Sequence, residues 1–258
     1  MGGTTFGGSG CTAPGQPNAA NDSMTVSAAH SAVDEVTSNP ADETGQPGTS
    51  VVLRTQRGLE SLYRVDTHLD VTDFLVTDEY RRIINPARTP REQLLVEQSH
   101  DDELGLALFL DPGAVNNLER NDPIHRLDHR NFDDFCLVVE GVSHFIYFAL
   151  RAAADRSVSA LELELQAEVD KFACCVLLST QVDRPWGRYL YDDVRFASDL
   201  DDEEGPRYRM ANACARRYAK SLSRRYLDAD RLDDMLPELR RFYRMTWDDK
   251  CGHIDRVA

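Results

Sequence analysis

The sequence predicts a mainly α-helical, bundle-like single domain built on a central antiparallel helix pair, with a small β-hairpin. Residues 135–150 are apolar on nearly all sides of a helix, which is typical of a buried helix. Residues 159–178 follow after a short connection and are rich in strong helix formers. Residues 93–98 and 104–110 are candidate strands, the second with alternating leucines, and residues 99–103 would close them as a hairpin.

The first 50 residues differ in composition from the rest. They are rich in Gly, Ser, Thr, Ala and Pro and contain five acidic residues but no Lys or Arg. Such a segment has too few apolar residues to form a core, so residues 1–50 are predicted to be a disordered acidic tail. No basic segment followed by an apolar run is present, so we do not expect a signal peptide. The α-rich globular domain is predicted to span residues 51–258.

Short helices are predicted between the tail and the central pair. Residues 55–65 and 72–84 fit short helices, with Thr72 as the cap of the second. Asp111 followed by Pro112 predicts the start of another short helix, because Asp is a good cap and Pro is tolerated at the first helical position.

The two central helices have recognisable N-termini. Asn131 is the expected cap of the first helix. Ser159 and Glu162 have the spacing of a capping box at the start of the second. Apolar and polar residues alternate over residues 161–169, a period of two that formally fits a strand. However, β-branched residues are nearly absent, so a helix is favoured.

The antiparallel arrangement predicts which residues face one another. If the turn centres near residue 155 or 156, residues whose numbers sum to about 311 lie level, because both helices rise equally per residue. The level pairs are His144 with Glu168, Glu140 with Lys171, and Tyr147 with Glu164. A buried Glu/His/Lys cluster between the two helices follows, since unpaired burial of these groups would be costly.

The C-terminal part is predicted to be irregular at first and then helical. Residues 181–198 are aromatic and irregular, and residues 199–204 form an acidic run expected in a solvated loop. Helices are predicted at residues 207–226 and 232–245, the latter with Pro237 as a possible kink.

Composition limits the classes of function. The formal net charge of −15 argues against a protein held on nucleic acid or anionic lipid by overall attraction. The apolar residues 135–150 are too short for a bilayer span and contain an ionisable pair, so no membrane association is expected. The six cysteines form no C-x-x-C pair, which argues against a zinc ribbon or a thioredoxin-type motif. Four of them lie in apolar segments predicted to be helical, where reduced cysteine behaves as a small hydrophobic residue, so a cytoplasmic location is expected.

The central polar cluster is the first candidate site. Carboxylates and imidazole projecting from facing helices are the ligands with which helical bundles hold divalent metals. The candidate metal ligands are Glu140, His144, Glu164 and Glu168. The spacing E-x-x-x-H occurs once, whereas di-iron bundles use E-x-x-H twice. The alternatives are a metal-free buried network of Glu140, His144, Glu168 and Lys171 that fixes helix register, and acid–base catalysis by His144 oriented by Glu168.

Two further candidates lie outside the central pair. His125 and His129 are four residues apart, so a short helix could present both to zinc; a solvated segment is the alternative. Arg216, Lys220 and Arg224 are also spaced by four and would form a basic face for an anion or a partner. They belong to a C-terminal portion, residues 206–258, with 13 basic and 8 acidic residues, against 16 and 36 in the remainder.

Three hypotheses for function result. The first is a cytosolic interaction or regulatory module with a protein partner, in which the polar cluster serves packing specificity. The second is a metal-dependent enzyme that uses the same cluster. The third is nucleic-acid contact through the basic C-terminal helices, which the overall negative charge disfavours.

Overall fold

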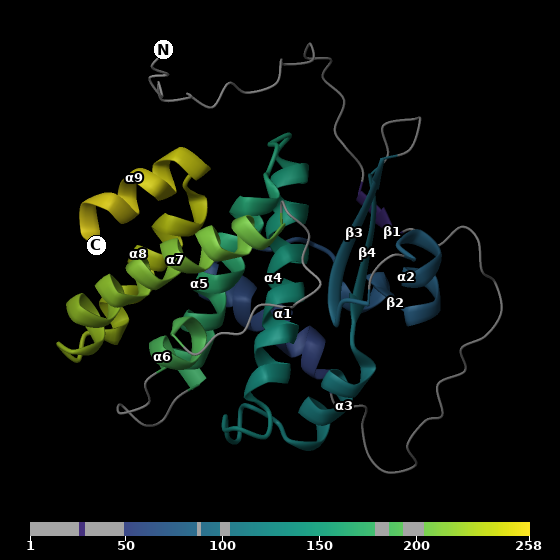
Figure 1. Cartoon of the computed structure of the whole chain (residues 1–258), viewed down its shortest axis with the longest axis horizontal. Coiled ribbons are helices and arrows are strands. Elements are labelled where there is room, and N and C mark those ends of the chain that lie inside the picture. The colour runs from purple at the N-terminus through teal and green to yellow at the C-terminus, as the bar shows by residue number, and fades with distance from the viewer. Residues whose placement is uncertain (1–25, 29–48, 87–88, 99–103, 179–185, 193–203) are drawn as a thin grey trace, which may run out of the picture.

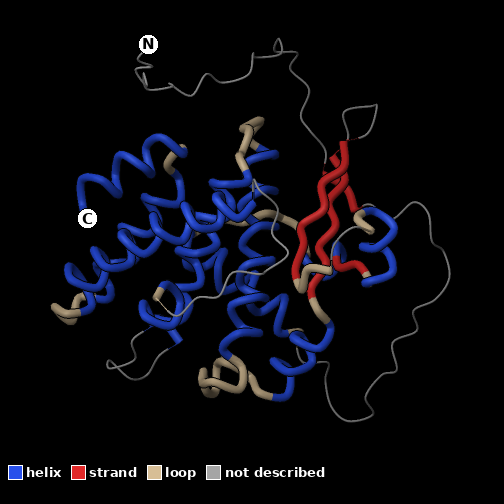
Figure 2. Tube along the Cα trace, viewed as in Figure 1, coloured by secondary structure: helices blue, strands red, loops and turns tan. Residues whose placement is uncertain are grey.

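Helices dominate the part of the chain that the structure describes, as predicted. The computed structural model describes residues 26–28, 49–86, 89–98, 104–178, 186–192 and 204–258. Figures 1 and 2 show a group of helices with a small sheet on one side. The predicted fold class, mainly α with a small β element, is confirmed.

The helical elements follow one another from residue 51 to residue 257. The α-helices are α1 (Val51–Tyr63), α2 (Asp78–Ile84), α3 (Pro112–Arg120), α4 (Phe132–Ala153), α5 (Ala160–Leu178), α6 (Trp186–Tyr191), α7 (Glu204–Leu222), α8 (Leu232–Arg244) and α9 (Trp247–Val257). A 3-10 turn, η1 (Val71–Phe74), precedes α2, and a π-helical segment, η2 (Ser223–Leu227), continues α7.

The sheet is built around β4 (Leu104–Leu110), which is almost entirely buried. β3 (Glu92–Gln98) pairs with it in antiparallel fashion over its whole length, so the predicted hairpin strands are confirmed. The predicted connection, residues 99–103, lies outside the described residues. β1 (Val26–Ala28) and β2 (Leu75–Val76) both run parallel to β4. Since β3 occupies one edge of β4, β1 and β2 share the other.

Strand β1 falls within the range predicted to be a disordered tail. It pairs with residues 104–106 of β4. The remainder of the predicted tail up to residue 48 lies outside the described residues.

The prediction of one helix over residues 72–84 was wrong. Asp70 accepts a hydrogen bond from the Thr72 backbone (2.9 Å) and caps η1, while Thr77 caps α2 by accepting from the Tyr80 backbone (3.3 Å). Two caps seven residues apart divide the segment into a turn, the short strand β2 and a helix. Helix α1 also begins earlier than predicted, because Ser50 accepts from the Leu53 backbone (3.3 Å).

The C-terminal helices differ from the prediction in their bounds. The helix predicted at residues 207–226 begins at Glu204 and becomes π-helical at Ser223. In the next helix, α8, Pro237 lies inside the helix without dividing it. Helix α9 was not predicted; Thr246 caps it by accepting from the Asp249 backbone (3.3 Å). Of residues 181–198, predicted to be irregular, residues 186–191 are helical, and residues 181–185 and 193–198 lie outside the described residues. Residues 199–203 of the predicted acidic loop also lie outside them, and Glu204 begins α7.

Helix α4 lies between the sheet and α5, and α7 packs across α5 (Figure 1). With 22 residues, α4 is long and apolar enough to cross a bilayer, so the prediction that its length excludes a span was wrong. However, 72% of its most apolar 18-residue window is buried inside the protein, as in the core helix of a globular fold. The absence of membrane association remains a prediction.

Candidate metal centre

Helices α4 and α5 run antiparallel and bring ionisable side chains together in the core. Glu140 and His144 lie one turn apart on α4, so they share a face. On α5 the strict alternation of Leu and Glu spreads carboxylates around the helix, and several of them therefore point inward. The Ser159 hydroxyl accepts a hydrogen bond from the Glu162 backbone (3.2 Å) at the start of α5, as the capping box predicts.

Lys171 joins two of the carboxylates. Its Nζ lies 3.0 Å from Glu140 Oε2 on α4 and 2.7 Å from Glu168 Oε1 on its own helix. The other oxygen of Glu168, Oε2, accepts a hydrogen bond from Asn212 of α7 (3.4 Å). Glu140 and Lys171 thus lie level, as the predicted register requires.

The predicted pairing of His144 with Glu168 does not occur in the structure. His144 Nε2 faces Glu164 Oε2 at 3.6 Å, and Nδ1 faces Glu92 Oε1 of β3 at 3.3 Å. Glu168 instead turns toward α7, because Lys171 on its own helix and Asn212 hold both of its oxygens. The sequence offered no sign that α5 packs against α7 as well as α4.

The predicted partner of Tyr147, Glu164, lies two residues along α5 from the observed one. The Tyr147 hydroxyl donates to Glu162 Oε1 (2.6 Å) rather than facing Glu164. Glu164 is therefore free of the predicted tyrosine contact and turns toward His144.

Glu92 is a residue of the cluster that sequence reasoning missed. It lies at the start of β3, and it comes near His144 because α4 packs against the sheet. Gly141 permits this approach, since a Cβ there would lie 2.8 Å from Glu92 Cγ and 2.7 Å from Leu110 Cδ2. An isolated Gly inside an apolar helix was the available signal that another element comes close.

Most of the cluster is shielded from solvent, and the Glu140 side chain is 21% exposed. His144, Glu164, Glu168 and Lys171 are each at most 8% exposed. Tyr208 of α7 covers it further: burial, followed by the charges of the nearby carboxylates, raises the pKa of this tyrosine, which hydrogen bonds to Glu164. Charges buried in this way interact strongly, because the local dielectric is low.

The buried charges shift one another's protonation. Burial lowers the pKa of His144, but the Glu92 and Glu164 carboxylates outweigh this and hold that pKa well above its usual 6.5. Burial raises the pKa of Glu92, only partly offset by His144. Burial also raises the pKa of Glu140, yet Lys171 and His144 outweigh it and lower the net value. In the absence of another cation, His144 is thus an imidazolium between two carboxylates.

Three of the four predicted metal ligands, Glu140, His144 and Glu164, lie close to one another. One ligand atom from each of Glu140, His144 and Glu164 lies within 4.8 Å of the other two. Ligands of a single transition metal at about 2.0–2.2 Å from the ion are separated by about 3–4 Å, so small side-chain rotations would suffice. Glu168, the fourth predicted ligand, is outside this group and is bound to Lys171.

The chain matches no protein-family model, no curated protein and no solved structure. A function for this protein is therefore inferred from its own side chains.

A second buried network, which was not predicted, is centred on Asp170 of α5 and includes Ser143 of α4. Asp170 accepts hydrogen bonds from Ser143 (2.6 Å), from Gln166 (2.7 Å) and from Tyr63. Lys250 of α9, fully buried, donates to Gln166 Oε1 (2.8 Å) and to the Tyr147 hydroxyl (2.8 Å). It is a closed arrangement that ties α9 to the central pair.

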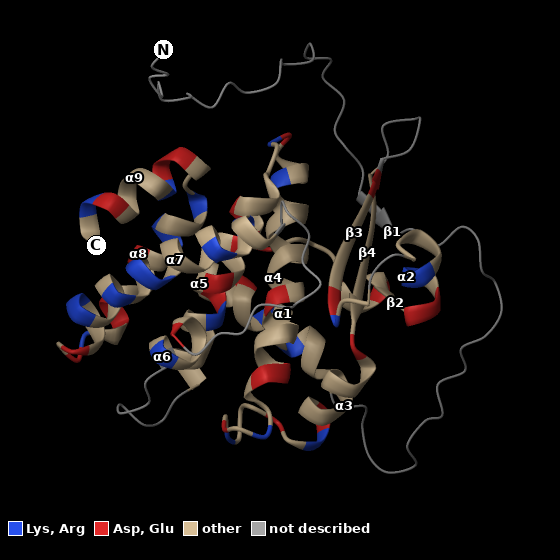
Figure 3. Cartoon of the chain, in the orientation of Figure 1, with Lys and Arg blue, Asp and Glu red and all other residues tan. Residues whose placement is uncertain are grey.

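The remaining sequence candidates lie at the surface. His125 and His129 are exposed, and their segment forms turns rather than the short helix considered for zinc. Arg216 pairs with Asp192, whereas Lys220 and Arg224 line a cavity beside α7. Figure 3 shows basic residues along α7 and α8.

Proposed function

We propose that this protein binds a divalent transition-metal ion in its core, through His144, Glu140 and Glu164. The proposal rests on the surroundings of His144 Nε2, the ring nitrogen that faces Glu164. This buried nitrogen has no hydrogen-bond partner among the described residues and faces Glu164 at 3.6 Å, too far for a normal hydrogen bond. A buried ring nitrogen without a partner is costly, and a metal ion would satisfy it.

The charge balance of the cluster supports a cation. The contacts described above join four carboxylates, those of Glu92, Glu140, Glu164 and Glu168, to one ammonium and one imidazole. Even with His144 protonated, acidic groups outnumber basic ones in this set. A divalent ion that replaces the imidazole proton would reduce the excess negative charge.

The side chains have distinct roles in this centre. His144 supplies a nitrogen ligand and Glu140 and Glu164 supply oxygens, a set that suits Mn²⁺, Fe²⁺ or Zn²⁺. Glu92 accepts from His144 Nδ1 and so orients the ring with Nε2 toward the site, as carboxylates commonly do for metal-bound histidines. Lys171 holds one oxygen of Glu140 and leaves the other for the ion. A metal so placed would act as a Lewis acid.

Metal analysis of variants tests the proposal. Protein stripped with chelator is loaded anaerobically with Mn²⁺, Fe²⁺ or Zn²⁺, desalted and analysed by mass spectrometry for metal content. We expect about one ion per chain in the wild type and its loss in His144→Ala and Glu164→Gln, because each removes a ligand.

The matched control is His253→Ala. It removes another buried histidine, which lies 2.5 Å from Glu238 and contacts Arg241, and neither residue contacts His144. Metal retained in this control and lost from the ligand variants supports the centre. A folded wild-type protein that takes up none of the three metals would refute it.

One contact favours a second candidate function, an interaction or regulatory module without metal. Lys171 already neutralises Glu140 and Glu168 in a closed bridge between α4 and α5, which is suited to fixing helix register. For this candidate, the cluster is structural and partner binding occurs elsewhere. A metal-free, folded protein in the experiment above would favour it.

A further inference from the structure

Three arginines gather where the end of α1 meets α8. Arg64 follows the last residue of α1, and Arg240 and Arg244 lie one turn apart on α8. Arg240 donates from Nε to the Leu62 carbonyl (2.7 Å), and Arg244 donates from Nη2 to the Tyr63 carbonyl (2.9 Å). The two helices therefore meet through guanidinium groups, and we call Arg64, Arg240 and Arg244 the arginine cluster.

The arginine cluster has no carboxylate of its own. None of its three members forms an ion pair with a residue that the structure describes. Glu60 lies one turn before Arg64 on α1, but its carboxylate accepts from the Thr67 hydroxyl instead (2.7 Å). Burial, followed by the charges of Arg64 and Arg244, lowers the pKa of Arg240. The three positive charges therefore repel one another.

The guanidinium groups also keep unused donors. Arg240 donates only through Nε, and its two Nη groups have no partner within the described ranges of the chain. The side chain of Arg64 is exposed and makes no hydrogen bond with these ranges. Arg244 is exposed and binds backbone carbonyls through both Nη groups. Carbonyls thus fix two of the three arginines, and a fixed guanidinium loses less entropy when it binds an anion.

The backbone of Arg64 has a conformation that favours glycine. Its φ of 52° and ψ of 55° are left-handed, at the C-cap of α1. Helix ends in this conformation usually have Gly or Asn, because a Cβ is strained there. The other described non-glycine residues with positive φ are His68, Asp155 and Asp230, whose types adopt it more readily. An arginine that is kept at a strained position points to a function for its side chain.

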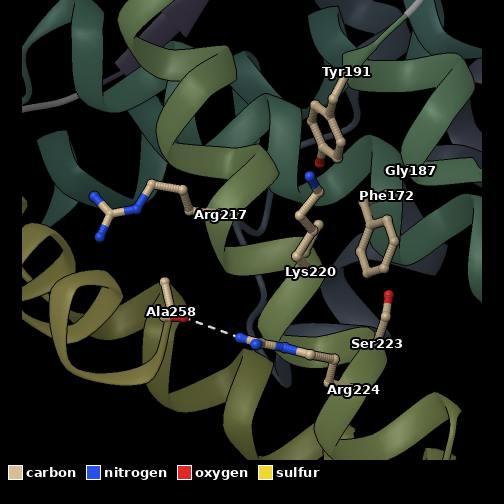
Figure 4. Close-up of a pocket in the computed structure, with 9 residues that line it drawn as sticks. Phe172, Gly187, Tyr191, Arg217, Lys220, Ser223, Arg224 and Ala258 are labelled. Atoms are coloured by element: carbon tan, nitrogen blue, oxygen red, sulfur yellow. Dashed lines mark hydrogen bonds between the residues drawn. The ribbon is translucent and has the colours of Figure 1, made fainter.

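The basic residues at the cavity beside α7 differ from this cluster. Arg217 Nη1 lies 3.0 Å from Asp255 Oδ1, and Arg224 donates to the oxygen of Ala258 (3.0 Å) and so turns away from Lys220 (Figure 4). Most of the positive charge at that cavity is therefore engaged within the protein. In the arginine cluster, by contrast, all three charges lack an acidic partner among the described residues.

We propose that the arginine cluster binds an acidic peptide segment of a protein partner, whose carboxylates pair with Arg64, Arg240 and Arg244. A guanidinium matches a carboxylate through two parallel N–H···O bonds, and both Nη groups of Arg240 have no partner in the described chain. The cluster includes part of the basic portion, residues 206–258, whereas the overall charge of −15 repels an extended polyanion such as nucleic acid. None of the three arginines is a proposed metal ligand, so the two proposals are tested separately.

Fluorescence anisotropy of the purified full chain tests this surface, with a fluorescein-labelled oligoglutamate peptide as the probe and the oligoglutamine peptide for comparison. Salt at about 100 mM largely screens repulsion from distant acidic residues. We expect saturable binding of the glutamate peptide and none of the glutamine peptide. Arg244→Met keeps an apolar side chain but removes the charge, and should weaken binding about threefold or more.

Arg64→Gly separates binding from folding. Glycine relieves the left-handed strain, so this variant should unfold at a higher urea concentration than the wild type and yet bind the probe about threefold or more weakly. This test holds even if Arg244→Met fails to fold, which circular dichroism shows.

The matched control is Arg120→Met. Arg120 is exposed in the last turn of α3 and donates to the carbonyl four residues before it (3.1 Å), as Arg244 does on α8 (2.8 Å). The control should leave the affinity within about twofold, because Arg120 is not in the arginine cluster.

Weaker binding in the folded Arg64→Gly and Arg244→Met variants, with affinity retained in Arg120→Met, supports the surface. Four outcomes would overturn it: no saturable binding of the glutamate peptide to the wild type, unchanged binding in Arg64→Gly, equal loss in Arg120→Met, or tighter binding of an oligothymidylate, which would assign the arginines to nucleic acid.

Discussion

Gly141 lies where helix α4 meets the sheet. Glycine inside a helix costs about 1 kcal/mol relative to alanine, so its presence needs a compensating reason. The reason is contact: the space that a side chain would fill is occupied by Leu110 and by the methylene of Glu92. Gly141 thereby brings Glu92 within 3.3 Å of His144.

Gly141→Ala is expected to destabilise the protein by about 1–3 kcal/mol, because the added methyl group overpacks the interface between α4 and β4. Urea denaturation of the metal-free protein measures this. Gly58→Ala is the control, since Gly58 lies in the middle of α1 with nothing within 4 Å; this change should stabilise by about 0.5–1 kcal/mol. Equal effects of the two substitutions would contradict the role given to Gly141.

Lys250 is a second residue with an unusual environment. Burial lowers its pKa from the usual 10.5 to about 7, and the nearby charge of Glu162 only partly opposes this. In the unfolded chain the same lysine stays protonated up to its ordinary pKa. Between pH 7 and 10.5 the unfolded state therefore binds more protons, and stability contributed at this site rises with pH.

The pH dependence of Lys250→Met tests this assignment. Between pH 7 and about pH 9.5, the wild type should gain about 3 kcal/mol of unfolding free energy relative to the variant, because the cost of removing the lysine's proton on folding falls as the pH approaches the unfolded-state pKa. Guanidinium denaturation of both proteins at each pH gives the difference. Parallel pH profiles would show that Lys250 keeps its ordinary pKa in the folded state.

At the scale of elements, the pair α4 and α5 holds its charges through Lys171. This ammonium is the link between a carboxylate of α4 and one of α5; Lys171 and Glu168 are buried, and the Glu140 side chain is 21% exposed. Such a bridge adds little net stability compared with apolar packing, but removing one partner leaves buried charges unpaired.

Lys171→Met should destabilise the metal-free protein by about 3–5 kcal/mol, because Glu140 and Glu168 lose their shared cation. The control is Arg231→Met, which removes an exposed ion pair with Asp234 and should cost less than about 1 kcal/mol. Thermal and urea denaturation compare the two. If both variants are equally stable, Lys171 does not neutralise the cluster.

The main elements were predictable where the local pattern was strong. The apolar run of α4, the capping box of α5 and the cap at Asp111 each have a local physical cause, and all three helices form. Residues 72–84 were misread because Asp70 and Thr77 compete with Thr72 as caps. Helix α9 was missed because its contacts, such as Lys250 with Tyr147, are distant in sequence.

The candidate centre could be predicted only as far as two helices define it. Equal rise along antiparallel helices placed Glu140 beside Lys171 correctly. It could not place Glu92, which comes from the sheet, or Asn212, which draws Glu168 toward α7. These partners depend on how separate elements pack, and the register of one helix pair carries no information about that.

At the scale of the whole molecule, charge is divided unevenly along the chain. Residues 206–258 carry a net charge of +5, and the rest carries −20. The basic portion includes most of α7 and all of α8 and α9 (Figure 3); α7 packs against α5, α8 against α1, and α9 against α7. Attraction between the oppositely charged parts of the chain favours this packing.

The most direct test of the proposed metal centre is a crystal structure of the protein soaked in Mn²⁺, with anomalous scattering used to locate the ion. We predict one anomalous peak in the core, about 2.0–2.3 Å from His144 Nε2 and from oxygens of Glu140 and Glu164, with Glu92 still at His144 Nδ1. A structure at high Mn²⁺ without a core peak, with His144 still 3.6 Å from Glu164, would contradict the account.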